Sequence, residues 1–358
     1  MGGSSANGRV ALLVSESTGF LHLHLGRMLP LLLAVALPIF GACGSETHYV
    51  YDDPPPSSEP ELPPAEAAYR LVDGKATWAP SDDRIAYLHR SKPDEPGGVY
   101  EVRLDAFHRP TDRRLVLQPR GAVAWLRYSP DSRRLAFCMS ADIYTLDLAT
   151  GELRQVTNIH DAQSPDWHPD GRHIIYNRVS WGIGIYPPAD SGGIRIVDLD
   201  TGLDEPLRLR SGRVLWGGEA RIARDGRRVV FRHYRPETGG LEIMLYSPDF
   251  DEVKRLTATG WICDYPRWRR NDARILFAVN IPIFSPDPWY SIAAEGGDVS
   301  PYVRPGLILN LGLNAEFNRD DTMFVLTARD ANSEDGVLWI RQVGVDGAVD
   351  AWQVTDYR

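Results

Sequence analysis

Two carboxylates and two aromatic side chains are the strongest candidates in this chain for binding or transforming a ligand. Glu219, Asp264, Trp125 and Tyr265 all stand three or four residues before a ten-residue phrase that recurs along the sequence. Aromatic platforms combined with carboxylates suit the binding of a peptide, a basic side chain or a sugar. In an enzyme, Glu219 and Asp264 could instead serve as acid and base.

The positions three and four residues before the phrase hold different residue types in the other copies. The phrases agree with one another, whereas these upstream residues do not. We interpret the varied residues as a ligand-binding surface; the alternative is that they only solvate the mouth of a channel. The full candidate set is Lys75, Trp125, Gln163, Ser164, Glu219, Asp264, Tyr265 and Asn314.

Sequence motifs for catalysis, metal binding and phosphate binding are missing. The chain has no H-E-x-x-H, no G-x-x-x-x-G-K and no G-x-S-x-G. His168 and His173 lie close to Asp170, which could suggest a metal. Both histidines belong to the recurring phrase, however, where other copies place Ala, Ser or Arg. We therefore expect no catalytic residues, no metal and no cofactor.

The recurring phrase is the strongest signal in the sequence. Six gapless copies begin with a large apolar residue, here called the anchor, and spacings of 39 to 55 residues separate successive anchors. Position four is Asp in four copies, and positions eight and nine are apolar in all six. Such a period is typical of repeat architectures. The copies are WAPSDDRIAY (78–87), YSPDSRRLAF (128–137), WHPDGRHIIY (167–176), IARDGRRVVF (222–231), WRRNDARILF (268–277) and FNRDDTMFVL (317–326).

Each phrase predicts a β-hairpin. In the third copy Trp167 ends one strand, residues 169–171 (Pro-Asp-Gly) form the turn, and His173 begins the next strand. A second hairpin follows in each unit, most clearly at 143–157 and 194–209. Two hairpins make a four-stranded antiparallel blade, and six blades make an all-β, six-bladed β-propeller. An irregular β-sandwich would not repeat its turn phrase six times.

This pattern resembles the TolB-type propeller family, whose repeat carries a W-S-P-D-G-like phrase followed by an I-A-F-like strand. The resemblance covers residues 69–358, and the fourth to sixth phrases depart from it, with Ile222 for the aromatic anchor and Arg270 and Arg319 for Pro. The resemblance implies a fold more than a function, because such propellers occur in partner-binding proteins, beside hydrolase domains and in some enzymes.

Composition narrows the class of partner. The chain of 358 residues carries a net charge of −9, whereas nucleic-acid binding needs a basic face. We expect a monomer that binds an envelope protein or peptide and no nucleic acid. Long insertions carry binding surface in many folds, and the insertion at 180–193 adds Trp181 and Tyr186 as candidate contacts.

The first 42 residues predict a targeting segment. Residues 29–42 carry no charge, and as a helix they would span about 21 Å, less than the ~30 Å of a bilayer core. This suits a signal peptide. Small residues before Cys43 resemble the lipobox of bacterial lipoproteins, so Cys43 is the predicted lipidation site. An ordinary secreted protein cut near Ala42 is the alternative.

A proline-rich segment separates this N-terminus from the propeller. Six of the eleven residues from Pro54 to Pro64 are proline, which favours an extended, semi-rigid spacer over residues 43–68. The sequence therefore predicts a non-catalytic binding platform in the cell envelope, tethered to a membrane through a lipid. The alternative is a small propeller enzyme, a lyase or a hydrolase, that acts on a glycan or a peptide.

Overall fold

The computed structural model describes residues 72–90, 97–178, 193–235, 237, 239–280, 289–302, 316–329, 336–342 and 351–355. The chain divides into two units, Met1–Ala42 and Cys43–Arg358, and every described residue belongs to the second. The predicted signal segment, Cys43, the spacer, Trp181, Tyr186 and Asn314 lie outside the described residues. Within the described part of the chain, no helix is long and apolar enough to cross a membrane.

The described strands fall into six consecutive antiparallel groups of four, which confirms the predicted fold. Blade 1 is β1 (Val72–Trp78), β2 (Arg84–Arg90), β3 (Gly98–Leu104) and β4 (Pro110–Leu117). Blade 2 is β5 (Val123–Tyr128), β6 (Arg134–Met139), β7 (Asp142–Asp147) and β8 (Leu153–Gln155). Blade 3 is β9 (Ala162–Trp167), β10 (His173–Arg178), β11 (Gly193–Asp198) and β12 (Asp204–Pro206).

The remaining blades follow the same order. Blade 4 is β13 (Gly218–Ile222), β14 (Val229–Arg235), β15 (Gly240–Ser247) and β16 (Glu252–Arg255). Blade 5 is β17 (Ile262–Trp268), β18 (Arg274–Asn280), β19 (Trp289–Ala293) and β20 (Ser300–Pro301). Blade 6 is β21 (Glu316–Phe317), β22 (Met323–Arg329), β23 (Gly336–Gln342) and β24 (Ala351–Gln353).

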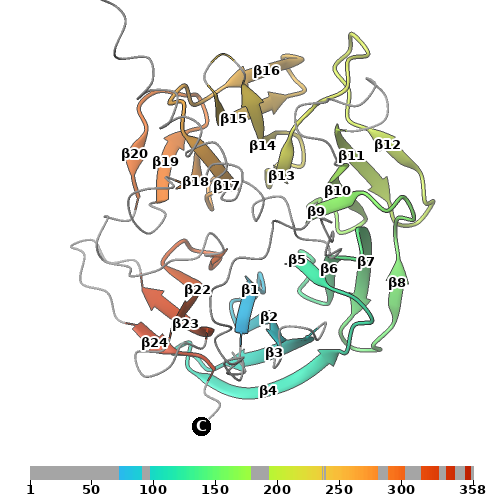
Figure 1. Cartoon of the computed structure of the whole chain (residues 1–358), viewed down its shortest axis with the longest axis vertical. Helices are drawn as coiled ribbons and strands as arrows, with labels where there is room; N and C mark the ends of the chain where they lie inside the picture. The colour runs from blue at the N-terminus through green and yellow to red at the C-terminus, as the bar shows by residue number, and fades with distance from the viewer. Residues whose placement is uncertain are drawn as a thin grey trace, which may run out of the picture. The chain divides into compact units, whose positions relative to one another are not determined.

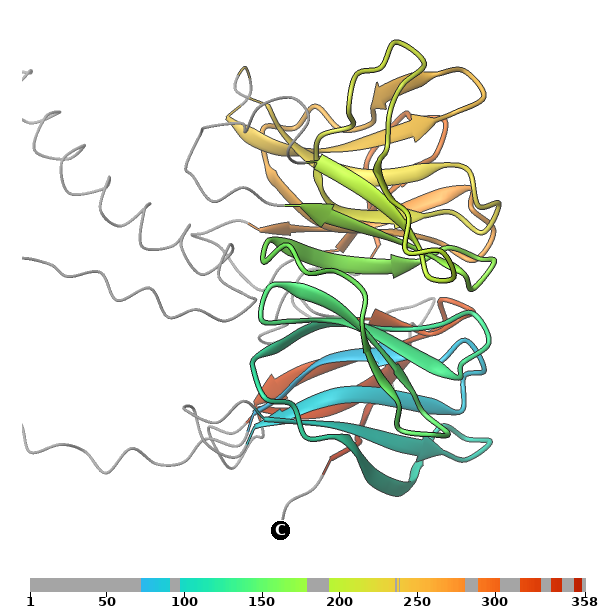
Figure 2. The same cartoon turned by 90° about the vertical axis from the view of Figure 1, so that its right-hand side faces the viewer.

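The blades are arranged around a central axis with the first strand of each blade innermost (Figures 1 and 2). Neighbouring first strands contact one another from β1 through β5, β9 and β13 to β17, and β21 contacts β1. Buried apolar clusters lie between successive blades; Ile175 and Phe231, for example, share the cluster of blades 3 and 4. The innermost strands therefore bring the residues that precede each anchor toward the axis.

All six phrases form the predicted hairpin turn, and position five has a positive φ in every copy. Two copies have Gly there, Gly171 and Gly226, and the others have a residue in the left-handed region at φ between 52° and 62°. Asp170 at position four accepts the N–H groups of Arg172 and His173 at 2.8 and 3.0 Å. This is the turn chemistry expected of Asp followed by Gly.

Position five also explains why three phrases lack proline at position three. Each Arg at position three has a free N–H, and the Asp at position five of the next blade accepts it: Asp272 from Arg224 (2.9 Å), Asp321 from Arg270 (3.1 Å) and Asp82 from Arg319 (3.0 Å). Where position three is Pro, the next blade has Ser or Gly at position five. The two positions therefore act as a pair across each interface between blades.

The pair Asp82–Arg319 also closes the ring, because it joins blade 1 to blade 6. The indole of Trp78 in blade 1 donates to the carbonyl of Glu316 in blade 6 at 3.0 Å. Trp167 and Trp268 make the same bond to the preceding blades, to the carbonyls of Arg127 (3.1 Å) and Arg221 (3.0 Å). Within the described residues, the outermost strand β24 pairs with β23 of its own blade.

We expect Arg319→Pro and Asp82→Gly to be coupled in a double-mutant cycle. Each single change leaves one partner without its hydrogen bond and should lower the free energy of unfolding by about 1 kcal/mol. The double variant recreates the Pro169–Gly226 combination of blades 3 and 4, so its loss should fall short of the sum by at least about 0.5 kcal/mol. Urea unfolding measures all four proteins, and strictly additive losses would contradict the pairing.

Candidate functional site

A β-bulge recurs at the same place in the innermost strand of every blade from 1 to 5. In each, two residues oppose one residue of the second strand, and the opposed residue is the last of the phrase. The first bulged residue lies three positions before the anchor and has a φ of 53° or 54°. A left-handed conformation is unfavourable for any residue with a Cβ, and bulges re-aim side chains. These residues are Lys75, Trp125, Ser164, Glu219 and Tyr265.

The bulge gives the predicted binding residues two different environments. Gln163, Ser164, Glu219 and Asp264 are all buried, and Asp264 is completely so. Lys75, Trp125 and Tyr265 are partly exposed. Some of the varied residues that we interpreted as a ligand-binding surface are therefore buried and stabilise the fold. Direct contact with a ligand falls to the partly exposed members.

Burial changes the electrostatics of Lys75. Its own burial, aided by the nearby charge of Arg90, lowers the pKa of Lys75 to about 8. A lysine of this kind is close to losing its proton near neutral pH, and it responds strongly to an approaching anion.

Glu219 and Asp264 share one cation, Arg232 of β14. The Arg232 guanidinium is ion-paired with Asp264 and lies 3.6 Å from Glu219 Oε1. Glu219 Oε2 also accepts the backbone N–H of Tyr265 at 2.7 Å, which joins blade 4 to blade 5. Both carboxylates are thus held by a buried arginine.

Asp264 is the member of this group whose protonation is most perturbed. Burial raises its pKa to about 6, with Arg232 opposing the rise and Glu219 adding to it. Among the described residues, Asp264 Oδ2 has no hydrogen-bond partner. A carboxyl with a pKa near neutrality and one unused oxygen can take up and release a proton near neutral pH, but its complete burial keeps Asp264 out of direct contact with a ligand in this conformation.

A second charged group lies immediately before the anchor in five of the six copies, and sequence reasoning missed it. Arg127 of blade 2 lies 3.3 Å from Glu316 of blade 6, and Arg267 of blade 5 is ion-paired with the same carboxylate. Blade 1 lies between blades 6 and 2 around the ring, since β1 contacts both β21 and β5, so this contact passes over the innermost strand of blade 1. We call the five charged residues the axial charge cluster: Arg127, Asp166, Arg221, Arg267 and Glu316.

The other contacts of the cluster tie it to the bulges. Asp166 Oδ2 accepts the backbone N–H of Ile222 at 3.0 Å. Arg221 donates to Ser164 Oγ at 3.2 Å, which gives this buried candidate a defined partner. Arg267 Nε is buried without a hydrogen-bond partner among the described residues. The signal was present in the alignment, because the residue before the anchor is charged in five of the six copies.

The axial charge cluster holds three guanidinium groups against two carboxylates. Burial, followed by the charge of Arg127, lowers the pKa of Arg221 to about 10. Burial also lowers the pKa of Arg267. Although burial raises the pKa of Glu316, the neighbouring arginines outweigh it and the net shift is downward. Within a chain of net charge −9, this cluster taken by itself therefore carries an excess of positive charge.

This arrangement suits an anion with a planar, bidentate acceptor. Guanidinium groups bind carboxylates through paired hydrogen bonds, more strongly where solvent is scarce. The side chains of Arg127 and Arg267 remain 11% exposed, and that of Glu316 17%. The cluster is therefore mostly desolvated but not sealed.

Comparisons with known proteins agree on the fold. No protein-family model matches the sequence, and no curated protein matches it. Similar solved structures include TolB from Acinetobacter baumannii (TM-score 0.54, 19% identity), where 80% of this chain is matched and the chain spans 64% of that protein, just under two thirds. An oligogalacturonate lyase in complex with manganese has a TM-score of 0.52 and 16% identity over 79% of this chain and 77% of the lyase. The tricorn protease has a TM-score of 0.56 and 16% identity over 81% of this chain and 27% of the protease.

Proposed function

The chain has a TolB-like β-propeller fold, and we propose that it is a non-catalytic binding platform of the cell envelope. It binds a protein or peptide ligand that presents a carboxylate to the axial charge cluster. Trp125 and Tyr265 flank the ligand, and lipid attached to Cys43 holds the propeller near a membrane through the proline-rich spacer. The excess of guanidinium over carboxylate within the axial charge cluster of an acidic protein is the observation that carries this proposal.

Several features of the structure support binding rather than catalysis. The two carboxylates proposed as acid and base are both engaged by Arg232. The positive φ at the bulge holds Trp125 and Tyr265 in a fixed backbone conformation, which limits the entropy that a ligand must remove. A preorganised aromatic beside buried arginine is typical of interface hot spots.

Photo-crosslinking in cells tests the proposal. A photoreactive amino acid replaces Trp125, and mass spectrometry identifies what is captured. We expect one dominant protein adduct that disappears in an Arg267→Met background and persists in an Arg227→Met background, since Arg227 pairs with Asp249 on the exposed rim. An adduct pattern that is identical in both backgrounds would contradict ligand binding at the axis.

A second function, a lyase or hydrolase acting on a glycan or peptide, is favoured by one observation. Asp264 combines a pKa near neutrality with an unused oxygen, as a general base requires. Incubation with oligogalacturonate, whose carboxylates fit the same cluster, separates the two functions. Unsaturated products that are formed by wild type and not by Asp264→Asn would establish lyase activity. Binding of the oligosaccharide without turnover would support the non-catalytic binding platform.

A further inference from the structure

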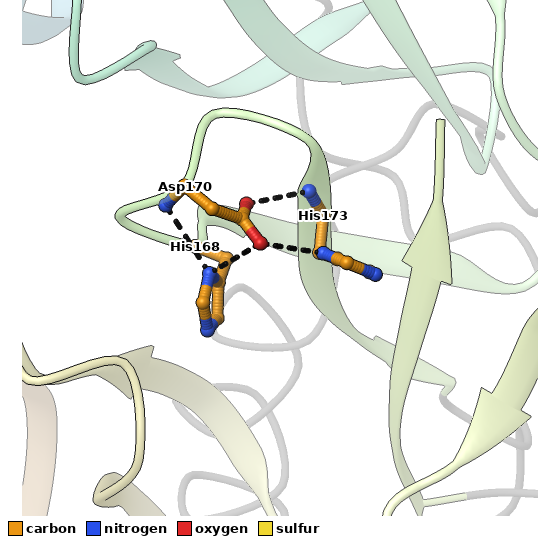
Figure 3. A group of neighbouring side chains, drawn as sticks. All are labelled: His168, Asp170 and His173. Atoms are coloured by element: carbon orange, nitrogen blue, oxygen red, sulfur yellow. Dashed lines mark hydrogen bonds and ion pairs between the residues drawn. The ribbon is translucent and has the colours of Figure 1, made fainter. Parts of the chain in front are cut away.

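Two histidines and an aspartate converge in the turn of the third phrase, between β9 and β10 (Figure 3). His168 Nδ1 lies 2.9 Å from Asp170 Oδ2, and His173 Nδ1 lies 2.7 Å from the same oxygen. The three ligand atoms all lie within 4.8 Å of one another. The side chains are 22%, 37% and 30% exposed in chain order, so an ion can reach them from solvent.

The outer nitrogen of His168 fixes its tautomer. Its Nε2 lies 3.0 Å from the carbonyl of Gly226 in blade 4, and a carbonyl can only accept. Nε2 therefore carries the proton, and Nδ1 of the neutral ring presents a lone pair. That lone pair accepts the backbone N–H of Asp170 at 3.2 Å and lies 2.9 Å from Asp170 Oδ2, so a metal ion bound between this nitrogen and oxygen would replace a long backbone hydrogen bond.

His173 has a similar arrangement. Its Nε2 lies 3.8 Å from Asp198 Oδ2, an acceptor on the facing strand β11 that Arg172 holds by an ion pair. Its Nδ1 faces Asp170. In protein metal sites, ligating histidines characteristically donate their second N–H to a carbonyl or a carboxylate. His168 has such an acceptor within hydrogen-bond distance of Nε2, Asp198 lies farther from His173 Nε2, and both rings face the common carboxylate at Nδ1.

The carboxylate itself is preorganised. Asp170 Oδ1 accepts two backbone N–H groups, from Arg172 at 2.8 Å and from His173 at 3.0 Å, which turns Oδ2 toward both rings. Among the phrases, the third is the one with His at positions two and seven. The hairpin therefore forms without these histidines in its sister blades, and its turn geometry does not require them.

We propose that His168 Nδ1, His173 Nδ1 and Asp170 Oδ2 bind a divalent transition-metal ion, with zinc as the best-matched metal. Two imidazoles and one carboxylate form a donor set that zinc accepts, with a fourth position left for water or another ligand. Metal–ligand bonds of about 2.0 Å in a tetrahedron place donors about 3.3 Å apart. Each ring nitrogen needs to move about half an ångström away from Asp170 Oδ2 to reach this nitrogen–oxygen spacing. The site goes beyond the binding function proposed above, and it departs from the sequence-based expectation of no metal.

The sister blades supply variants that remove the ligands and keep the turn. Position two is Ser129 in blade 2, position seven is Arg134 there, and position four is Asn271 in blade 5. The variants are therefore His168→Ser, His173→Arg and Asp170→Asn. His160→Ser is the matched control, because His160 contacts a single carboxylate, Asp142, at 2.9 Å.

Isothermal titration of the untagged, metal-stripped full chain with zinc chloride tests the proposal. We expect one equivalent to bind to wild type and to His160→Ser, with affinity falling at least tenfold in each ligand variant. Zinc should also raise the melting temperature of wild type and leave that of His168→Ser unchanged. Cobalt should give the visible absorption of a tetrahedral site in wild type and in His160→Ser, but not in the ligand variants. Affinity should weaken as pH falls through the histidine range. Equal zinc binding by wild type and by a His168→Ser/His173→Arg double variant would overturn the site, and so would no binding by wild type.

Discussion

Replacing Arg232 with Met should lower the free energy of unfolding by about 3–5 kcal/mol at pH 8, the largest stability loss expected from any one substitution discussed here. The change removes the cation that Asp264 and Glu219 share, and both carboxylates are buried. Breaking a buried ion pair by deleting one partner leaves an uncompensated charge in a poorly solvated place. Guanidinium unfolding followed by tryptophan fluorescence measures the loss.

The pH dependence of this variant separates electrostatics from packing. Asp264 has a folded-state pKa near 6, above the ordinary 3.8, and removal of Arg232 raises it further. Below the folded pKa, the folded protein binds a proton that the unfolded chain does not. Stability that Arg232→Met loses should therefore return in part as pH falls from 8 toward 4.5. Asp264→Asn in the same background should remove this pH dependence.

An exposed ion pair on the same blade provides the control. Arg227 pairs with Asp249, and their side chains are 60% and 50% exposed. Surface pairs of this kind contribute about 0–1 kcal/mol, so Arg227→Met should be nearly neutral. If Arg232→Met cost no more than Arg227→Met, the buried network would be incidental.

The second large effect concerns ligand binding and has a sign that a general structural defect cannot reproduce. Arg267→Met removes one of three guanidinium groups, and we expect affinity for a carboxylate ligand to fall about thirtyfold or more. Glu316→Gln removes a competing carboxylate from the same pair and should increase affinity. A panel of acidic tripeptides, titrated calorimetrically into each protein, measures both. Weaker binding in both variants would indicate damage to the fold instead of a cationic site.

The repeated phrase was enough to predict the propeller, because its turn residues and apolar positions act locally and recur. Asp170 caps its own turn as expected, and position five adopts a positive φ in every copy. The contacts between blades could not be predicted in the same way. That Asp82 accepts the N–H of Arg319 depends on two residues 237 positions apart in the chain.

The candidate site was predicted less well, and the bulge explains why. Sequence spacing predicted that Ser164 and Glu219 line the mouth of a channel. They lie instead within the innermost strands β9 and β13, and both are buried, because an inserted residue changes the alternation of faces along a strand. The ion pairs of Arg127 and Arg267 with Glu316 could not be predicted either, because these residues come together only when the ring of blades is closed. A charged residue immediately before the anchor in five of the six copies could have been recognised from the sequence. The residues with which these charged side chains form ion pairs could not have been.

The most direct test of a cationic axial site compares the affinities of a carboxylate ligand and of the corresponding neutral amide. Calorimetry with wild-type protein would compare each tripeptide that binds with the same peptide amidated at its C-terminus and carrying Asn or Gln for each acid. If the axial charge cluster receives a carboxylate, affinity should drop at least tenfold on amidation, and the difference should vanish in Arg267→Met. Equal affinity of acid and amide for the wild-type protein would contradict the account.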